Sequence, residues 1–409
     1  MKILQVNTVI KGSSVGRIMA DLYQVIEDEG HEARVAVGRE PMPEDYEGIL
    51  IGNKKDFYIH VARNFLLGEA GFASEEVTAR FLRYIDEEKP DIIHLHNIHG
   101  FYLQVEHLFA YLKKKKIPVV WTLHDCWSFT GHCAYYDYAA CEKWKTGCHT
   151  CIQHAKVYPY ALLRDNTIAS YRRKRKAFCG VENLTIVTPS RWLADQVGQS
   201  FLKEYPIRVI PNGIDLSVFT AKEAGAKTET PVILGVANIW ELRKGLGYFE
   251  KLSEDLSGTC QVELIGISKK QKKELKKKHG NKMVLLERTA NIEELAKEYR
   301  KAAVYVNATL EDNFPTTNLE ALACGTPVVT YATGGSGEAV TKECGIVVQR
   351  ANYDKLLAAV KEVLKEKESG GFSVSSCRKR AEEFDKNIRY REYLRLYEEI
   401  LNKPAEERI

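Results

Sequence analysis

The sequence predicts an α/β protein built from two doubly wound, Rossmann-like domains. Short apolar runs rich in β-branched residues alternate with amphipathic helical patterns along the whole chain, as parallel sheets with buried strands require. A small, polar segment at 220–231 divides this series into halves of about six runs each. The chain has 409 residues, of which 44% are hydrophobic and 28% charged, so it is long enough to bury two cores.

The same patterns give the expected order of the elements. Strands are expected to start at Lys2, Ala33, Asp91, Pro118, Leu184, Ile207, Val232, Gln261, Met283, Ala303 and Pro327. Amphipathic helices are expected at 18–29, 105–116, 192–201, 292–302 and 353–366. We place the first domain at 1–215, with a Cys-rich insertion at 126–154, and the second at 216–386. Residues 387–409 are then expected to form a C-terminal helix that packs back toward the first domain.

Charge and hydropathy exclude several classes of protein. The net charge is only +4, which is too balanced for a dedicated nucleic-acid-binding protein. No apolar run approaches the roughly 20 residues that span a bilayer, and the first ten residues alternate like a strand rather than forming a signal peptide. We therefore expect a cytoplasmic protein that binds no nucleic acid.

The segment 307–329 carries the strongest functional signal. A strand ends in a loop of acidic and small polar residues, after which Thr316 or Thr317 is expected to cap a helix. A helix N-terminus at the carboxyl end of a strand offers amides and a positive dipole end, which favour phosphate. Asp312 and Glu320 flank this anion site. Carboxylates there suit hydrogen bonds from hydroxyl groups, as sugars offer.

Four motifs then follow one another in an informative order. Asp312 stands eight positions before Glu320, and Cys-Gly-Thr-Pro-Val-Val follows at 324–329. The other motifs are VIPNGID at 209–215, ILGVANIWELRKG at 233–245 and TYATGGSGEAV at 330–340. Together they resemble the retaining family-four glycosyltransferases with the GT-B fold. Thr-Gly-His-Cys after the TLHD strand resembles the branch of that family that assembles polysaccharides.

The resemblance implies a site for a nucleotide-diphosphate sugar in the second domain, with UDP as the default nucleotide. Lys244 matches the family's phosphate-binding lysine, while Asn238 stands where the family has an arginine, and Arg243 can supply that charge. Asp312 stands where the family usually has a glutamate that contacts the donor sugar, and Glu320 matches the acid that contacts the ribose. The expected donor-binding residues are Gly16, Arg243, Lys244, Asp312, Thr316, Thr317, Asn318 and Glu320.

In the first domain, a glycine-rich loop and a group of histidines are the candidate functional residues. The loop that contains Gly16 joins a strand to a helix, which is a phosphate-binding geometry, although a tight turn needs the same residues. His94, His96 and His99 follow one expected strand, and His124 follows another. His124 matches the family position that contacts the donor sugar, whereas a buried structural histidine is the alternative for each of the four.

The resemblance also implies a mechanism. His124, Asp312 and Lys244 are the expected catalytic residues of a hexosyltransferase that retains the anomeric configuration. In front-face attack the leaving phosphate takes the acceptor proton, so no protein nucleophile is needed. The sequence has no Asp-x-Asp motif, and no catalytic metal is expected. The acceptor is expected to be a glycan or lipid-linked glycan in capsule, exopolysaccharide or O-antigen assembly.

Five of the ten cysteines fall between residues 126 and 151. Cys133, Cys141, Cys148 and Cys151 have a spacing that suits a tetrahedral structural zinc site. The alternatives are ordinary loop thiols, an oxidised pair or an iron–sulfur cluster.

The basic runs at 113–116, 172–176 and 269–278 are expected to be solvated helix faces. With Tyr158, Tyr160 and Tyr171, the first two runs could instead rest on an anionic membrane surface.

Two other functions compete with glycosyl transfer. One is a nucleotide-sugar epimerase of the same architecture, and the other is a non-enzymatic zinc- or nucleotide-binding module.

Overall fold

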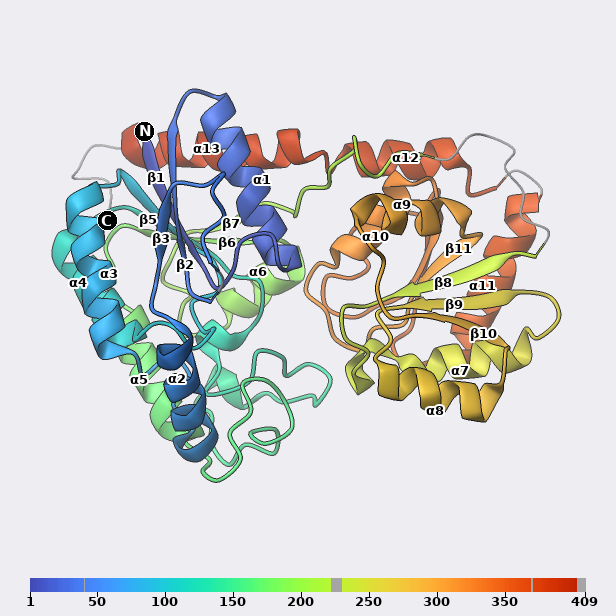
Figure 1. Ribbon diagram of the computed structural model, residues 1–409, viewed down its shortest axis with the longest axis horizontal. Coiled ribbons are helices and arrows are strands. Elements are labelled where there is room, and N and C mark those ends of the chain that lie inside the picture. Colours follow the sequence, from blue (N-terminus) through green and yellow to red (C-terminus); the bar gives the residue numbers. More distant parts are fainter. Residues whose placement is uncertain (40, 222–229, 369–370, 403–409) are drawn as a thin grey trace. The chain divides into compact units, whose positions relative to one another are not determined.

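A computed structural model describes residues 1–39, 41–221, 230–368 and 371–402. The chain divides into two compact units, one formed by Met1–Pro211 with the chain from Arg389 onward, the other by Asn212–Ile388 (Figure 1). Most of the polar segment expected to separate the halves, 222–229, lies outside the described residues, as does the C-terminal tail 403–409.

The first unit is built on a parallel sheet of seven strands in the order β3-β2-β1-β4-β5-β6-β7. These strands are β1 (Lys2–Asn7), β2 (Glu32–Val37), β3 (Gly48–Leu50), β4 (Ile92–Leu95), β5 (Val119–Thr122), β6 (Leu184–Thr188) and β7 (Ile207–Val209). The order reverses direction between β1 and β4. Ligands of doubly wound sheets bind beyond the carboxyl ends of the strands at such a point.

Helices cover both faces of this sheet. They are α1 (Ser14–Asp28), α2 (Lys54–Leu67), α3 (Glu75–Glu88), α4 (Val105–Lys115), α5 (Thr167–Phe178), α6 (Arg191–Gly198) and α13 (Lys386–Asn402). One hydrophobic cluster joins the sheet to α1 and α13, and the other joins it to α3, α4, α5 and α6. Side chains alternate between these clusters along each strand, as in β1, where Ile3 belongs to one cluster and Leu4 to the other.

The second unit repeats the architecture with six parallel strands in the order β10-β9-β8-β11-β12-β13. The strands are β8 (Val232–Val236), β9 (Gln261–Ile265), β10 (Met283–Leu286), β11 (Val304–Asn307), β12 (Val328–Tyr331) and β13 (Gly345–Val348). The helices are α7 (Leu246–Asp255), α8 (Lys269–His279), α9 (Ile292–Lys301), α10 (Thr316–Ala323), α11 (Tyr353–Glu368) and α12 (Val374–Glu382). The direction of the strand order reverses between β8 and β11. The predicted α/β class with two Rossmann-like sheets is confirmed.

The boundary between the units falls between Pro211 and Asn212 rather than at 215. Ile214 forms a β-bridge with Asp385, donates its N–H to the carbonyl of Phe384 at 2.8 Å, and lies in the hydrophobic core of the second unit. Residues 212–215 therefore fold with the second unit, although the sequence places them in the first domain.

The last helix, α13, belongs to the first unit from Arg389 onward. Tyr393 and Tyr397 are buried, and their hydroxyl groups lie 3.2 Å from Thr122 Oγ1 and 2.6 Å from His94 Nδ1. The first unit therefore takes part of its core from the end of the chain. No helix among the described residues combines the length and apolarity needed to cross a membrane.

Candidate functional site

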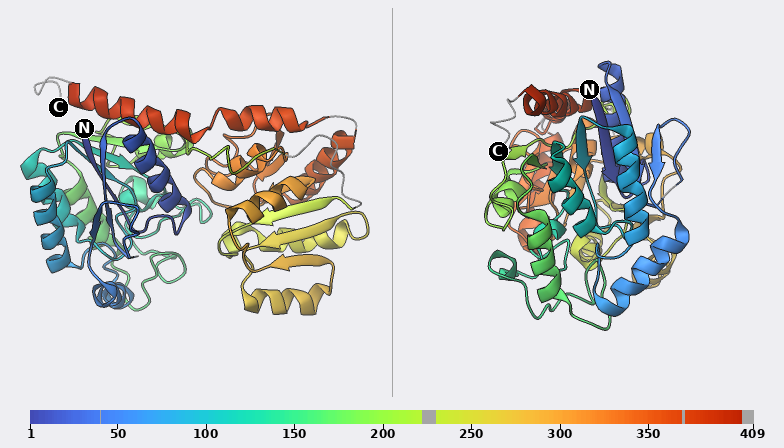
Figure 2. Two further views of the ribbon diagram at one scale, coloured as in Figure 1. Left: turned by 45° about the horizontal axis from the view of Figure 1, so that its top comes forward. Right: turned by 90° about the vertical axis from the view of Figure 1, so that its left-hand side faces the viewer.

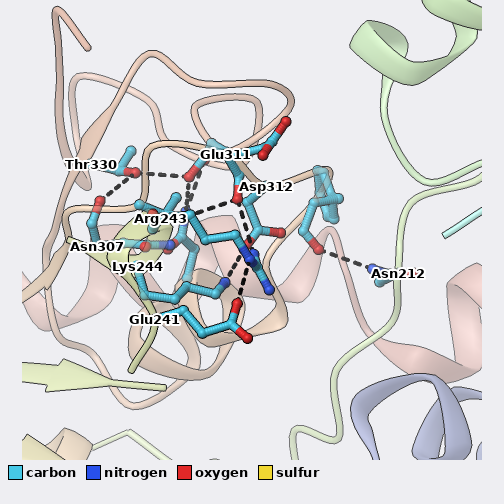
Figure 3. A network of polar contacts seen from close by, with 12 residues as sticks. Asn212, Glu241, Arg243, Lys244, Asn307, Glu311, Asp312 and Thr330 are labelled. Atoms are coloured by element: carbon cyan, nitrogen blue, oxygen red, sulfur yellow. Dashed lines mark hydrogen bonds and ion pairs between the residues drawn. The ribbon is translucent and has the colours of Figure 1, made fainter. Parts of the chain in front are cut away.

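In the second unit, Lys244 and Asp312 meet at the point where the strand order reverses (Figure 3). Lys244 ends the short 3₁₀ helix after β8, Leu242–Lys244, and Asp312 lies in the loop after β11. Lys244 Nζ lies 2.5 Å from Asp312 Oδ2, and both side chains are about one-fifth exposed, 23% and 18%. The structure thus brings together two of the three predicted catalytic residues.

Gly245 fixes how closely these two loops approach. Its φ angle is +77°, and a Cβ atom there would lie 2.1 Å from the carbonyl oxygen of Ala308. Next to this approach, the N–H of Leu310 donates to the carbonyl of Arg243 at 2.7 Å. Because only glycine tolerates both the positive φ and the contact, the Lys-Gly pair positions Lys244 against the β11 loop.

The Arg243 side chain is held within the same loops. Its Nε lies 3.1 Å from Glu241 Oε2, and its Nη1 donates to the carbonyl of Glu311 at 3.3 Å. The structure thus places Arg243 beside Lys244, as predicted, with its guanidinium already in contact with an acid.

The N-terminus of α10 follows the Asp312 loop. Thr316 is the first helical residue and Pro315 occupies the cap position without a side-chain hydrogen bond, so the predicted threonine cap does not form. Thr316 and Thr317 are partly exposed, and the first N–H groups of a helix have no acceptor within the helix. The amide of Asn212 donates to the carbonyl of Phe314 at 3.1 Å and holds the loop before this helix.

Beneath the helix N-terminus, Asn318 and Glu320 are buried and hydrogen-bonded. The amide of Asn318 accepts from Asn307 at 2.9 Å and donates to the carbonyl of Ser336 at 2.8 Å. Glu320 Oε2 accepts from Tyr299 at 2.9 Å, and burial raises the pKa of Tyr299 well above its usual value, so that its hydroxyl stays a donor. The Asn318 side chain therefore supports the helix from below.

In the first unit, Gly16 has a structural role in the described conformation. Its N–H donates to Ser13 Oγ at 3.0 Å, which caps α1, and a Cβ atom at Gly16 would lie 2.9 Å from the backbone nitrogen of Lys11. The N–H of Gly16 thus belongs to the cap of α1, and the place of Gly16 in the donor site stays a prediction.

His94, His96 and His124 lie together toward the carboxyl ends of β4 and β5, where His94 and His96 are buried and His124 is partly buried. His96 Nδ1 lies 3.0 Å from His124 Nε2, and His96 Nε2 lies 3.4 Å from Gln5 Oε1. The amide nitrogen of Gln5 donates to the carbonyl of Met19, which directs Gln5 Oε1 toward His96. His96 therefore donates from Nε2 and accepts at Nδ1, which makes His124 Nε2 the donor of the pair.

These imidazoles are neutral near pH 7. Burial, with the neighbouring His124, lowers the pKa of His94 to about 3, and burial lowers that of His124 to about 4. His124 is thus a candidate hydrogen-bonding group and not a cation. The full burial of His94 and His96 favours the structural alternative for both.

Acid is expected to destabilise the first unit through these histidines. Unfolded imidazoles protonate near pH 6.5, whereas His94 and His124 stay neutral in the folded unit down to about pH 3–4. The unfolded chain therefore binds more protons below pH 6.5, and each histidine lowers the free energy of unfolding by up to about 1.4 kcal/mol per pH unit. Thermal midpoints at pH 7.5, 6 and 5 measure this slope. His94→Gln should reduce it, and an unchanged slope in that variant would contradict the assignment.

His99 forms a separate pair with Asp125. His99 Nε2 lies 2.9 Å from Asp125 Oδ2, and His99 Nδ1 lies 3.1 Å from the Tyr158 hydroxyl. Burial opposes the charge of Asp125, but the contact with His99, the N–H of Trp127 and the nearby His124 together lower the pKa of this carboxyl. His99 does not join the chain formed by His94, His96 and His124.

The Cys-rich insertion does not form a recognisable metal centre. Within the described ranges, no three His, Cys, Asp or Glu side chains are arranged so that they could hold a metal ion. Cys148 Sγ accepts from the N–H of Gly131 at 3.1 Å, and burial raises the pKa of this thiol to about 11. The structure therefore lends no support to zinc at Cys133, Cys141, Cys148 and Cys151, which stays a prediction that metal analysis of the purified protein tests.

Lys174 departs from the predicted solvated run at 172–176. It is buried, and its Nζ donates to the carbonyls of Trp127 at 2.7 Å and Thr130 at 3.1 Å. Burial lowers the pKa of Lys174 to about 7. Lys174 thus holds the first turn of the insertion.

Sequence reasoning missed the residues that support the site from below. Tyr299, Asn307 and Ser336 hold Glu320 and Asn318 from neighbouring segments of the second unit, and Tyr397 holds His94 in the first unit from 303 positions away. Asn307 is a polar residue at the end of an apolar strand and Ser336 lies in the motif at 330–340, whereas Tyr299 and Tyr397 carry no local signal.

Comparison with known proteins agrees with this architecture. Residues 15–218 match Glycosyltransferase Family 4, and residues 230–366 match Glycosyl transferases group 1. WcaC of Escherichia coli (strain K12), described as a colanic acid biosynthesis glycosyl transferase, is 32% identical over 133 residues. This match spans 31% of the chain and 32% of the length of WcaC.

Solved structures show the same fold over nearly the whole chain. Sucrose-phosphate synthase from Thermosynechococcus elongatus has a TM-score of 0.71 at 16% identity, covering 98% of this chain and 99% of that one. HepE of Anabaena, solved in complex with UDP, has a TM-score of 0.65 at 14% identity, covering 98% and 100%. With both halves matched in sequence and the fold shared, the chain belongs to the family-four glycosyltransferases with the GT-B fold.

Proposed function

We propose that this protein transfers a hexose from a nucleotide-diphosphate sugar, with UDP as the default nucleotide, to a glycan or lipid-linked glycan in cell-surface polysaccharide assembly. The observation that carries the proposal is the Lys244–Asp312 pair beside the N-terminus of α10, where the strand order reverses. The description of WcaC supports the pathway, and the UDP bound to HepE supports the nucleotide.

Each residue of the second unit receives a role that its contacts allow. Lys244 Nζ, which lies against Asp312 in the free protein, turns to the diphosphate, while the Asp312 carboxylate accepts a hydrogen bond from a sugar hydroxyl. Tyr299 donates to Glu320 Oε2 and the Thr316 hydroxyl lies 3.5 Å from Oε1, and the proposal assigns the Glu320 carboxylate to a ribose hydroxyl. The first N–H groups of α10 add positive potential at the phosphates.

The proposed reaction retains the anomeric configuration. The acceptor oxygen bonds to the anomeric carbon on the face from which the diphosphate departs, and the bond between that carbon and the phosphate oxygen breaks. The departing phosphate takes the acceptor proton, so the products are the glycoside and the nucleoside diphosphate. Lys244, Arg243 and the α10 amides stabilise the charge on the leaving group, which is the kind of preorganised electrostatics that catalysis depends on most. His124 is assigned as a neutral hydrogen-bonding group for the donor sugar.

A thermal-melt screen of the whole protein with UDP-, GDP- and ADP-sugars tests the donor site. A ligand at 100 times its Kd stabilises by about 2.7 kcal/mol, which raises the melting midpoint of a unit of this size by roughly 5–10 °C. We expect this shift with one nucleotide class, and we expect its loss in Lys244→Ala. No shift with any nucleotide would overturn the donor site.

Product analysis separates transfer from the competing functions. Transfer or slow hydrolysis should give a sugar whose anomeric configuration, read by NMR, matches the donor. A 2-epimer of the donor would instead identify an epimerase. Binding without turnover, with acceptor glycans present, would identify a binding module.

A further inference from the structure

Helix α2 of the first unit buries polar side chains and exposes apolar ones. Its two fully buried side chains, His60 and Asn64, are polar. His60 accepts from the N–H of Gly71 at 3.1 Å and lies 2.9 Å from Ser74 Oγ, while Asn64 donates to the carbonyl of Tyr160 at 2.7 Å. Helices of soluble domains usually bury their apolar side chains, so this reversal needs an explanation.

The outward side of α2 is apolar and continues onto the segment 152–168. Nine large side chains are exposed on these two segments: Tyr58, Ile59, Leu66, Leu67, Ile152, Tyr160, Leu162, Leu163 and Ile168. The most exposed are Leu163 at 75%, Ile152 at 68% and Tyr58 at 66%. We call these nine residues the α2 apolar surface. Scattered single apolar residues are normal on a protein surface, but a cluster of this size marks an interaction site.

Backbone contacts show that the two segments form one surface. The N–H groups of Leu162 and Leu163 both lie against the carbonyl of Phe65, at 2.9 and 3.3 Å, next to Leu66 in the chain. The N–H of Cys151 donates to Asp165 at 2.7 Å, which holds Ile152 near the same loop. Figures 1 and 2 show α2 and these loops at one end of the first unit.

The edge of this surface is positively charged. Lys54 and Lys55 are exposed at the start of α2. Beside Ile168, a shallow pocket is lined by residues that include Arg164 and Arg172, and no ion pair holds either arginine within the described part of the chain. Asp165, which also lines the pocket, accepts two backbone N–H groups, and Glu69, just after the end of α2, pairs with Arg63 at 2.8 Å.

We propose that the α2 apolar surface docks on an anionic lipid bilayer. Its aliphatic and tyrosine side chains enter the headgroup region while Lys54, Lys55, Arg164 and Arg172 contact lipid phosphates, the arrangement of an interfacial membrane-binding element. The inference goes beyond the proposed function because docking requires no donor. Docking through this surface would place the bilayer beyond the carboxyl ends of the strands, which is also the end of the sheet where His124 lies.

The basic residues beside the α2 apolar surface are not all those that the sequence suggested for membrane contact. Lys113–Lys116 end α4 and lead into the start of β5, so they lie at the opposite edge of the sheet. Lys115 and Lys116 pair there with Asp86 and Glu182. Of the three tyrosines in the sequence hypothesis, Tyr171 is buried, Tyr158 is partly buried with its hydroxyl on His99, and only Tyr160 is exposed.

Flotation of the whole protein with phosphatidylcholine vesicles, with and without 30% phosphatidylglycerol, tests the proposal. The wild type should float with the anionic vesicles, and less so as salt rises. Arg164→Gln with Arg172→Gln should lower the partition coefficient about 30-fold, since each basic residue contributes about 1 kcal/mol. Leu66→Gln with Leu163→Gln should lower it by about 100-fold or more, because each buried leucine contributes about 1.5 kcal/mol or more.

Matched controls change charge or apolarity elsewhere. Lys276→Gln with Lys277→Gln removes two exposed charges from α8, and Ile388→Gln removes an exposed apolar side chain from α13; both should float like the wild type. Melting midpoints confirm that every variant is folded. Equal flotation of all variants, or no flotation of the wild type, would overturn the proposal. A dimer in solution that Leu66→Gln with Leu163→Gln dissociates would overturn it as well, because the surface would then be an interface between copies.

Discussion

Lys244→Ala is expected to lower kcat/KM for the sugar nucleotide by about 10²–10³-fold. A preorganised charge aimed at a leaving group is worth about that much when it is removed, and the adjacent Arg243 is already engaged by Glu241 and the carbonyl of Glu311. Stability should change by less than about 1 kcal/mol, because both members of the Lys244–Asp312 pair are partly exposed. Initial rates of donor consumption, with melting midpoints, measure both effects.

Two further variants show whether the loss comes from the charge of Lys244 itself. Lys277→Ala removes an equal charge from an exposed position on α8 and should leave the rate unchanged. If Lys244 acted only by holding Asp312, Asp312→Asn would cause the same loss and the double variant would cause no further loss. A fall of less than about fivefold in Lys244→Ala would show that the phosphate charge comes from elsewhere.

Gly245→Ala is expected to destabilise the second unit by about 3–5 kcal/mol. A residue with a Cβ atom is strained at φ +77°, and that atom would lie 2.1 Å from the carbonyl oxygen of Ala308, so the loop must move away from β11. The melting midpoint of that unit should fall by roughly 6–15 °C. Activity should fall too, because Lys244 follows the displaced loop.

Gly258→Ala is the matched control for strain. Its φ is +83°, but a Cβ atom there would meet no atom within 4 Å. Gly258→Ala should therefore lower the free energy of unfolding only by the strain of a positive φ, about 1–2 kcal/mol. Equal midpoints for the two variants would show that the approach of Gly245 to Ala308 contributes nothing to stability.

The fold could be predicted because it rests on periodicity. Buried parallel strands need continuous apolar runs and their crossover helices need an apolar stripe, and both patterns are local in the sequence. Helix α2 breaks the second rule, since its outward positions are apolar and its buried positions are His60 and Asn64. No apolar stripe of α2, a helix that the structure describes in full, faces the core, and the same departure marks it as an interaction surface.

In the candidate site, too, some features follow from the sequence and others only from the tertiary structure. The local pattern points to Asp312 and Glu320, because they flank an expected helix N-terminus where phosphate and sugar hydroxyls could bind. Lys244 follows from the resemblance to the family, because two adjacent basic residues by themselves are usually solvated surface. For Gly16 and Asn318, which the resemblance assigns to the donor site, the tertiary structure adds partners that the sequence does not show, in the α1 cap and in the network with Asn307.

The sequence by itself therefore determined the two sheets, the family and the charged residues proposed for the donor. Only the tertiary structure decided which partners those residues meet. Tyr397, 303 positions after His94 in the chain, lies 2.6 Å from it, and Lys174 is buried within a run of basic residues that looked solvated. Hydrogen bonding and burial depend on which distant segments pack together, and no local pattern in the chain records that packing.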